Sequence, residues 1–384
     1  MELAETKRNL VWIIQLVLIA LLSTYIYSSF FVLPYRKIIQ MALATVLLIL
    51  TFWEVRKQLV TQDLLIGMLL LSSLLYFRFV SHPGHASITT GFPIICISLS
   101  FGLLLRYSRL NEMFFNLFSI FSVIPFLYVF LILKFNPEDL FYQISRNGVG
   151  YTLVFFISLQ ILTYVKQQKR YIPMIPVLGV LISSFYSQSR TGFVMAICLL
   201  LLVLLYNVSK CISFIQSQQG WKSRIFWLWV VVGILFLIGI ANIIWVMLMH
   251  SRFSTLGFNS SGRIDIYRQF FSELDLRAFL IGHRPDPKNV TKWHNTYLTM
   301  LSYFGAISLV FFFAVIVGFF RLLKQSWMLA GLMLIWMVYS LPESVSPFRY
   351  GDFLVIPLLM LAFPPTHFNK PIFPSFVCER DVSI

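Results

Sequence analysis

The chain is an almost continuous series of apolar stretches, and this pattern constrains its fold more than any other feature. Hydrophobic residues make up 58% and charged residues 12% of its 384 positions, whereas soluble proteins average roughly 25% charged residues. An α-helix rises about 1.5 Å per residue, so a stretch of about 16 to 24 apolar residues crosses about 30 Å of hydrocarbon. The pattern therefore predicts an all-α polytopic membrane protein.

About twelve stretches are suitable as transmembrane helices, and together they predict a single integral membrane domain over residues 1–384. They cover Val11 to Leu33, Ile38 to Trp53, Leu64 to Val80, Phe92 to Leu105, Met113 to Leu133, Val149 to Val165, Ile172 to Tyr186, Gly192 to Val208, Ile225 to Met249, Thr296 to Phe320, Trp327 to Leu341 and Phe353 to Phe363. The fourth, seventh and last are short. The first is too long for a signal peptide and has no small-residue cleavage site, so we expect it to remain as a span.

The Lys and Arg residues in the short connections predict the orientation, because cytoplasmic loops of membrane proteins are enriched in positive charge. With the N-terminus inside, inner connections hold pairs such as Arg56 and Lys57, or Arg106 and Arg109. An even number of spans places both termini, with a cytoplasmic tail at 364–384, on the inner side. The net charge of +15 then reflects inner basic residues that face anionic headgroups. We expect the lipid bilayer as a partner and no nucleic acid.

One connection is far longer and more polar than the others. Residues 250–294, between the ninth and tenth expected spans, form a large loop that this orientation places outside. Its charged residues are Arg252, Arg263, Arg268, Arg277, Arg284, Lys288, Lys292, Asp265, Glu273, Asp275 and Asp286. We expect this external loop to carry part of a functional site.

Arg190 lies in a tight connection, Ser187 to Gly192, between the seventh and eighth spans. The connection is so short that the side chain must sit at the outer membrane boundary. A guanidinium there costs a few kcal/mol unless it snorkels to water or faces a wet cavity. Gly192 would let neighbouring helices approach closely. An interfacial anchor and a ligand for an anion are both open at this point.

Arg263 begins a stretch in which apolar residues recur at helical spacing. These residues are Ile264, Tyr267, Phe271 and Leu274. A helix that begins here would place Arg263 and Arg268 in its first turns, where free backbone amides add to the attraction for an anion. The alternative is a surface helix that lies on the lipid headgroups.

His294 and Asn295 stand at the outer start of the tenth span. An imidazole titrates near neutral pH and can take a proton from a hydroxyl, while guanidiniums can hold a diphosphate by paired hydrogen bonds. The alternative for His294 is a solvated bystander, and Trp293 and Tyr297 are then aromatic residues of the membrane interface. The sequence contains no acidic or histidine cluster with metal-ligand spacing, and we expect no metal and no cofactor.

The order and side of these residues resemble a known family. Ser189-Arg190-Thr191-Gly192 before a span, Gly262-Arg263 and Gly282 in the large outer loop, and His294-Asn295-Thr296-Tyr297-Leu298 followed by Gly305 carry the resemblance. They are similar to the superfamily of O-antigen ligases and Wzy-type polysaccharide polymerases, which are membrane glycosyltransferases of the bacterial inner membrane. The resemblance implies a GT-C-like architecture with a large periplasmic loop between helices 9 and 10.

This resemblance implies a role for each motif. Arg190 and Arg263 would bind the diphosphate of an undecaprenyl-diphosphate-linked oligosaccharide, and His294 would be the base or orienting group for the acceptor hydroxyl. The reaction would be inverting and metal-independent. Further residues assigned to substrate binding are Arg268, Arg284, Lys292, Asn295, Arg349 and Glu343. The family also implies flippase and chain-length regulator proteins as partners.

The sequence leaves the family member open. The compact segment from Arg263 to His294 favours a repeat-unit polymerase, whereas a His-Asn pair at this position is more typical of ligases that transfer glycan to lipid A-core. A flippase or secondary transporter of lipid-linked or small anionic substrates is a third alternative. Transporters usually carry repeats and place charges near the bilayer midplane, whereas here the charges gather at one face.

Overall fold

The computed structural model is a bundle of helices. It describes residues 2–28, 30, 35–81, 88–107, 109–134, 146–217, 263–282 and 293–364, together with positions 239, 242, 245, 246 and 249. Within these ranges all regular structure is helical. The helices are α1 (Glu2–Tyr27), α2 (Arg36–Val55), α3 (Thr61–Tyr76), α4 (Ile88–Arg106), α5 (Glu112–Leu127), α7 (Arg146–Lys166), α8 (Ile175–Tyr186), α9 (Arg190–Ser217), α12 (Arg263–Ser272), α13 (Leu276–Ile281), α14 (Thr296–Phe304), α15 (Ile307–Gln325), α16 (Trp327–Tyr339) and α17 (Asp352–Ala362). Short π-helical turns extend α3 over Phe77–Ser81 and α5 over Tyr128–Ile132.

Among the described residues, 8 helices are long and apolar enough to cross a membrane, and α8, α16 and α17 are shorter apolar helices. The expectation of a polytopic α-helical membrane protein is confirmed at this level. The expected ninth span, Ile225 to Met249, lies outside the described residues apart from isolated helical positions, so the count of about twelve spans stays a prediction. Each of the other expected spans overlaps a helix.

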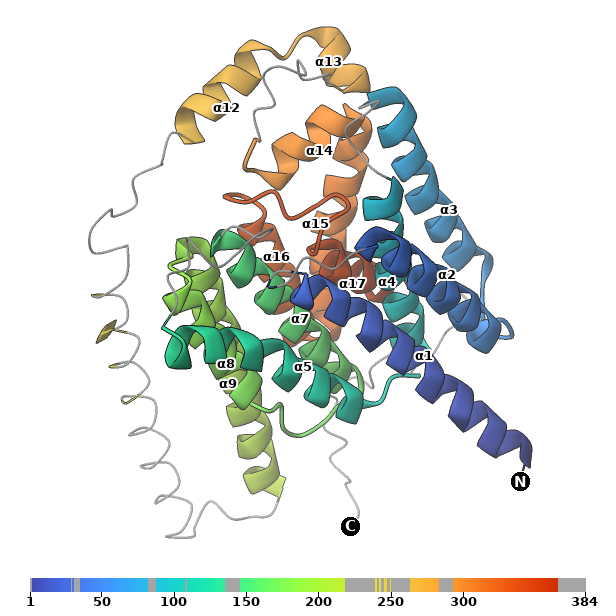
Figure 1. Ribbon diagram of the computed structural model, residues 1–384, viewed down its shortest axis with the longest axis vertical. Helices are drawn as coiled ribbons and strands as arrows, with labels where there is room; N and C mark the ends of the chain where they lie inside the picture. Colours follow the sequence, from blue (N-terminus) through green and yellow to red (C-terminus); the bar gives the residue numbers. More distant parts are fainter. Residues whose placement is uncertain are drawn as a thin grey trace, which may run out of the picture.

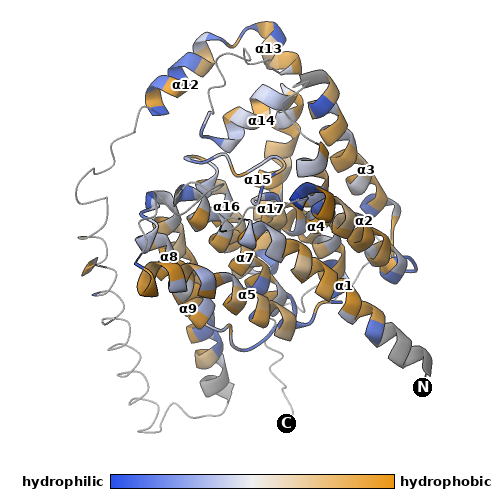
Figure 2. Cartoon of the chain, in the orientation of Figure 1, coloured by the Kyte–Doolittle hydropathy of each residue, from blue (hydrophilic) through white to orange (hydrophobic). Residues whose placement is uncertain are grey.

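Two of the long helices form the centre of the bundle. Nearly all of the apolar part of α7 is buried, and so is most of that of α4, whereas α3 and α15 bury little of theirs. The outer faces of α3 and α15 instead carry exposed residues such as Leu65, Met68, Val310 and Phe313. Exposed apolar side chains that recur along a long apolar helix are typical of contact with lipid rather than water. Figure 2 shows that the helices of the bundle are mainly hydrophobic.

Helices α12 and α13 lie across one end of the bundle, and α14 lies beneath them (Figure 1). We call this the α12 end. The hydroxyl of Tyr76, the last residue of α3, donates a hydrogen bond of 2.7 Å to the carbonyl of Ile281 in α13. The start of α3 therefore belongs to the opposite end. The connection between α16 and α17, residues 340–351, returns to the α12 end and contributes most of the polar groups described below.

The expected tenth span is wrong in one respect, because the structure divides it at Gly305 into α14 and α15. Gly305 has a φ of +58°, and a Cβ atom there would lie 2.4 Å from the carbonyl oxygen of Leu280. Gly282, at the end of α13, has a φ of +95°, and its Cβ would lie 2.7 Å from the carbonyl oxygen of Ser302. Only glycine tolerates both the positive φ and this close approach. The two glycines thus join α13 to the corner between α14 and α15.

A second pair of glycines joins α7 to α9. A Cβ atom on Gly192 would lie 2.7 Å from the Cα atom of Gly150.

We expect Gly192→Ala to lower the stability of the protein by about 1–3 kcal/mol, because the added methyl group meets backbone that must shift. Thermal unfolding of the purified protein in lipid nanodiscs measures the loss. The matched control is Gly67→Ala, whose Cβ would meet only the side-chain tip of Leu99 at 3.2 Å. Equal stability of the two variants would contradict the close packing.

Candidate functional site

The candidate site is centred on a buried carboxylate, that of Glu343 in the connection between α16 and α17. Its Oε1 atom accepts a hydrogen bond of 2.9 Å from Nη2 of Arg263 in α12 and one of 3.2 Å from Nδ2 of Asn147 in α7. Three segments that are distant in sequence therefore meet at one oxygen atom. The side chain of Glu343 is 9% exposed and that of Arg263 is 25% exposed, so the ion pair lies at the margin of the protein interior.

The start of α14 is fixed to the same connection through Thr296. Its hydroxyl donates to the carbonyl of Glu343 and accepts from the amide of Val345, both at 2.9 Å. The amide of Thr296 donates to the carbonyl of Ser340 at 2.8 Å. These three hydrogen bonds position the residues before Thr296, namely His294 and Asn295, beside the connection that carries Glu343.

Arg349 belongs to this connection as well. Its Nη1 atom donates a hydrogen bond of 2.8 Å to the carbonyl of Ser344. The buried carboxylate of Asp352 accepts from the amides of Phe348 and Arg349, at 2.6 and 3.3 Å, and so shapes the turn that leads into α17. The guanidinium of Arg349 is thereby held near Glu343, where its charge acts on the carboxyl group.

Arg190 is the first residue of α9, at the same end of the bundle. The hydroxyl of Ser189 accepts from the amide of Gly192 at 3.1 Å and so caps the helix. Gly192 contacts Gly150 of α7, and Asn147 lies about one helical turn before Gly150. The close approach that we expected from Gly192 is therefore confirmed. Arg190 is half-buried, and it begins its helix at the same level of the bundle as Asn147.

The helix expected at Arg263 is confirmed as α12, but the apolar residues that recur at helical spacing do not all face the protein. Ile264 and Phe271 are exposed, whereas Phe270 is buried. The ring of Phe270 meets the edge of Trp293 with 4.8 Å between centroids, and the hydroxyl of Tyr267 donates to the carbonyl of Leu341 at 3.2 Å. These contacts face the protein, and they bring Arg263 to Glu343.

The aromatic residues on either side of His294 contact other parts of the protein. Trp293 is buried, and the hydroxyl of Tyr297 donates to the carbonyl of Met337 at 2.9 Å. His294 itself is half-buried and has a φ of +47°. A non-glycine residue in the left-handed region is strained by roughly 1–2 kcal/mol, and such strain clusters at functional sites.

The remaining residues assigned from the sequence do not all come together. Arg268 is exposed and pairs with Asp265 at 3.4 Å, away from Glu343. The Oδ1 atom of Asn295 accepts from the amide of Leu298 at 3.0 Å, so this side chain serves as the N-cap of α14. Arg284 and Lys292 lie outside the described residues. Asn147 and Ser189 contribute to the site and were not among the substrate-binding residues expected from the sequence.

Electrostatics at the α12 end favour an anion. Burial raises the pKa of Glu343 above its usual range, and the guanidiniums of Arg263 and Arg349 oppose this rise. Two guanidiniums near one carboxylate leave a net positive charge in a partly desolvated place. Such an arrangement binds diphosphates and carboxylates through charge-assisted hydrogen bonds. In the described ranges, no group of three or more His, Cys, Asp or Glu side chains could hold a metal ion.

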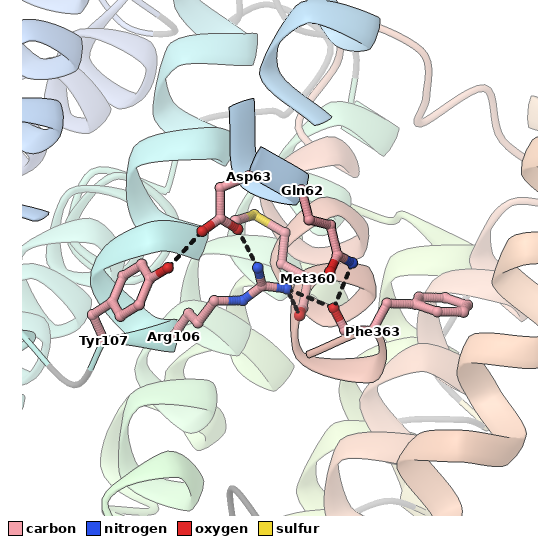
Figure 3. A network of polar contacts seen from close by, with 6 residues as sticks. All are labelled: Gln62, Asp63, Arg106, Tyr107, Met360 and Phe363. Atoms are coloured by element: carbon pink, nitrogen blue, oxygen red, sulfur yellow. Dashed lines mark hydrogen bonds and ion pairs between the residues drawn. The ribbon is translucent and has the colours of Figure 1, made fainter. Parts of the chain in front are cut away.

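A second polar cluster lies at the opposite end and was missed in the sequence. Arg106, the last residue of α4, forms a buried ion pair with Asp63 of α3, and its guanidinium also donates to the carbonyls of Met360 and Phe363 at the end of α17 (Figure 3). The hydroxyl of Tyr107 donates to the other oxygen of Asp63 at 2.5 Å. The expectation that Arg106 faces the headgroups is therefore wrong. Asp63 beside the start of an apolar stretch was the available signal.

This second cluster has the properties of a structural tie. Gln62 donates to the carbonyl of Phe363 at 2.9 Å, so α3, α4 and α17 are all joined at one point. The protein itself supplies the partners of Asp63, and the basic side chain at the C-terminal end of α17 satisfies carbonyls that the helix leaves open.

Comparisons of the chain with family models, with curated proteins and with solved structures find no match.

The buried ion pair gives a prediction about stability. Asp63→Asn removes the charge that compensates Arg106, and breaking a buried pair in this way costs about 3–5 kcal/mol. We expect a correspondingly lower unfolding temperature in nanodiscs. Asp265→Asn is the control, because the Asp265–Arg268 pair is mostly exposed, with both side chains more than three-quarters accessible, and such pairs contribute about 0–1 kcal/mol. A loss no larger for Asp63→Asn than for the control would refute the tie.

Proposed function

We propose that the protein is a membrane glycosyltransferase of bacterial surface polysaccharide synthesis, which polymerises undecaprenyl-diphosphate-linked oligosaccharide repeat units. In this proposal it resides in the inner membrane with both termini in the cytoplasm, and its α12 end faces the periplasm. The observation that carries the proposal is the pairing of Arg263 with Glu343, together with the charge of Arg349 that acts on the same carboxyl group. The helix starts that carry Arg190 and, just before α14, His294 lie at the same end of the bundle.

The proposed chemistry follows from this arrangement. The acceptor hydroxyl oxygen forms a bond to the anomeric carbon of the donor sugar, and the bond between that carbon and the diphosphate oxygen breaks. The electron pair of the broken bond leaves with the diphosphate, whose growing charge Arg190, Arg263 and Arg349 stabilise. The hydroxyl proton goes to His294. The phosphate-linked sugar is already activated, so the protein need only position the reactants and neutralise charge.

Complementation of a deletion strain tests the proposal. We expect Arg190→Ala and Arg263→Ala each to lower glycan transfer by roughly 100- to 1000-fold, as loss of a transition-state ligand does. Gels of the surface glycan would then show single repeat units on the normal acceptor in place of the ladder of the wild type. Arg277→Ala removes an exposed arginine of α13 and should leave the ladder normal.

Two outcomes of this complementation contradict the polymerase. A complete absence of attached glycan, with long chains on the lipid carrier, would identify a ligase, which the adjacent His294 and Asn295 also suggest by their resemblance to ligases. A normal ladder in the deletion strain would exclude both enzymes.

The role of His294 gives a prediction about pH. A neutral imidazole accepts the proton, so glycan transfer in membranes should fall at acidic pH when His294 is the base. His294→Ala should be slower and should lose this acidic limb. The measurement is the initial rate of glycan transfer as a function of pH in both proteins. An acidic limb retained in His294→Ala would remove His294 from this role.

A further inference from the structure

The position of Glu343 is unexpected for a site that binds a diphosphate. Its Oε1 atom lies 2.9 Å from Nη2 of Arg263. The carboxylate thus takes the place on the guanidinium that a phosphate oxygen of the ligand would take. Both hydrogen bonds to the carboxylate, from Arg263 and from Asn147, meet Oε1. Oε2 accepts none from the residues that the structure describes.

The two partners of this ion pair differ in how firmly they are held. The backbone carbonyl of Glu343 is fixed by the hydroxyl of Thr296, and its side chain is almost fully buried. Arg263 starts its helix and is more exposed, and the only hydrogen bond of its side chain to a described residue is made through Nη2. The guanidinium is therefore the partner that can move, and its other N–H groups remain to receive an anion.

We propose that Glu343 is a built-in counter-anion that competes with the diphosphate for Arg263, so that binding of the diphosphate displaces Arg263 from Glu343 and Glu343 takes up a proton. This inference rests on the proposed function, because it assumes that a diphosphate binds at Arg263. Glu343 is then a positioning residue, which keeps the guanidinium in place and neutralised until the ligand arrives. No covalent bond changes, and the proton comes from solvent.

The groups around Glu343 explain the uptake of a proton. Arg263 faces it from α12, Arg349 from its own connection, Asn147 and Tyr151 from α7 and Tyr339 from α16, while His294 precedes Thr296 on the α14 side. When Arg263 turns to the diphosphate, Arg349 is the remaining guanidinium among those that act on Glu343. Burial already raises the pKa of Glu343. Loss of the ion pair and the approach of a second anion raise it further, which favours the protonated form.

The test is the binding of undecaprenyl diphosphate to the full-length protein in nanodiscs, measured by calorimetry between about pH 6 and about pH 8 in buffers of different ionisation enthalpy. Glu343→Gln keeps the shape but not the charge. We expect this variant to bind undecaprenyl diphosphate roughly tenfold more tightly than the wild type near pH 8. The gain corresponds to the loss of about one charge-pair interaction, because the glutamine no longer competes for Arg263. This advantage should shrink as the pH falls, because protonation of Glu343 frees Arg263 in the wild type too. The wild type should also take up more protons per bound ligand.

A matched control separates this competition from a general change of field. Asp265→Asn removes one negative charge from the same helix without touching Arg263, and we expect its affinity and proton uptake to equal those of the wild type within about twofold, since the Asp265–Arg268 pair is exposed. Titration of the lipid diphosphate itself occurs with all three proteins, so the comparison between them isolates the contribution of Glu343. If Glu343→Gln does not fold, Glu343→Asp replaces it, because a shorter carboxylate releases Arg263 and should also bind more tightly.

The outcomes distinguish the inference from the proposed function. Binding to all variants with equal affinity and equal proton uptake overturns the competition and leaves the glycosyltransferase standing. An equal gain in Glu343→Gln and Asp265→Asn also overturns it, because the effect would then be a long-range field. Absence of binding to every variant overturns the inference together with the diphosphate site itself.

Discussion

The arrangement of the α12 end depends on the hydrogen bonds of Thr296. This one residue uses its hydroxyl and its amide to join the start of α14 to the connection between α16 and α17. A connection without regular structure has many backbone groups that need partners, and in an apolar bundle each group left unpaired costs several kcal/mol. By satisfying three of them at once, Thr296 fixes Glu343 in a single place. The ion pair with Arg263 and the position of α12 against the bundle both follow from that placement.

Close approach of backbone at glycine complements this hydrogen bonding. Gly150 and Gly192 bring α7 and α9 together, and Gly282 and Gly305 bring α13 against the corner of α14. Without side chains at these positions, helices can pack at short distances, and the packing gained offsets the lack of a hydrophobic driving force inside a membrane. The consequence is that the start of α9 and the end of α14 are held by backbone contacts, which are stiffer than contacts between flexible side chains.

The sequence predicted most of the helices because an apolar stretch in a membrane has few alternatives to an α-helix. It also predicted a helix at Arg263 and the close approach at Gly192. The break at Gly305 was not predictable from composition, because glycine also occurs within transmembrane helices and here the break depends on contact with Leu280 of a distant segment. The pairing of Arg263 with Glu343, 80 residues apart, and the burial of Arg106 likewise depend on tertiary contacts that no local pattern encodes.

The charged clusters around Arg106 and around Arg263 differ in a way that separates structure from function. At Arg106 the guanidinium meets a carboxylate and two carbonyls, and the carboxylate has a second donor in Tyr107. Both oxygens of Asp63 are therefore paired, and the guanidinium nitrogen that has no partner among the described residues, Nε of Arg106, is buried. At Arg263 the pairing is partial, since one guanidinium nitrogen meets one carboxylate oxygen and the other carboxylate oxygen accepts nothing from the described residues. Groups with unused hydrogen-bonding capacity, at the margin of a buried site and beside further positive charge, can exchange one anion for another. This difference in how completely the hydrogen-bonding groups are paired, more than the number of charges, identifies the α12 end as the candidate functional site.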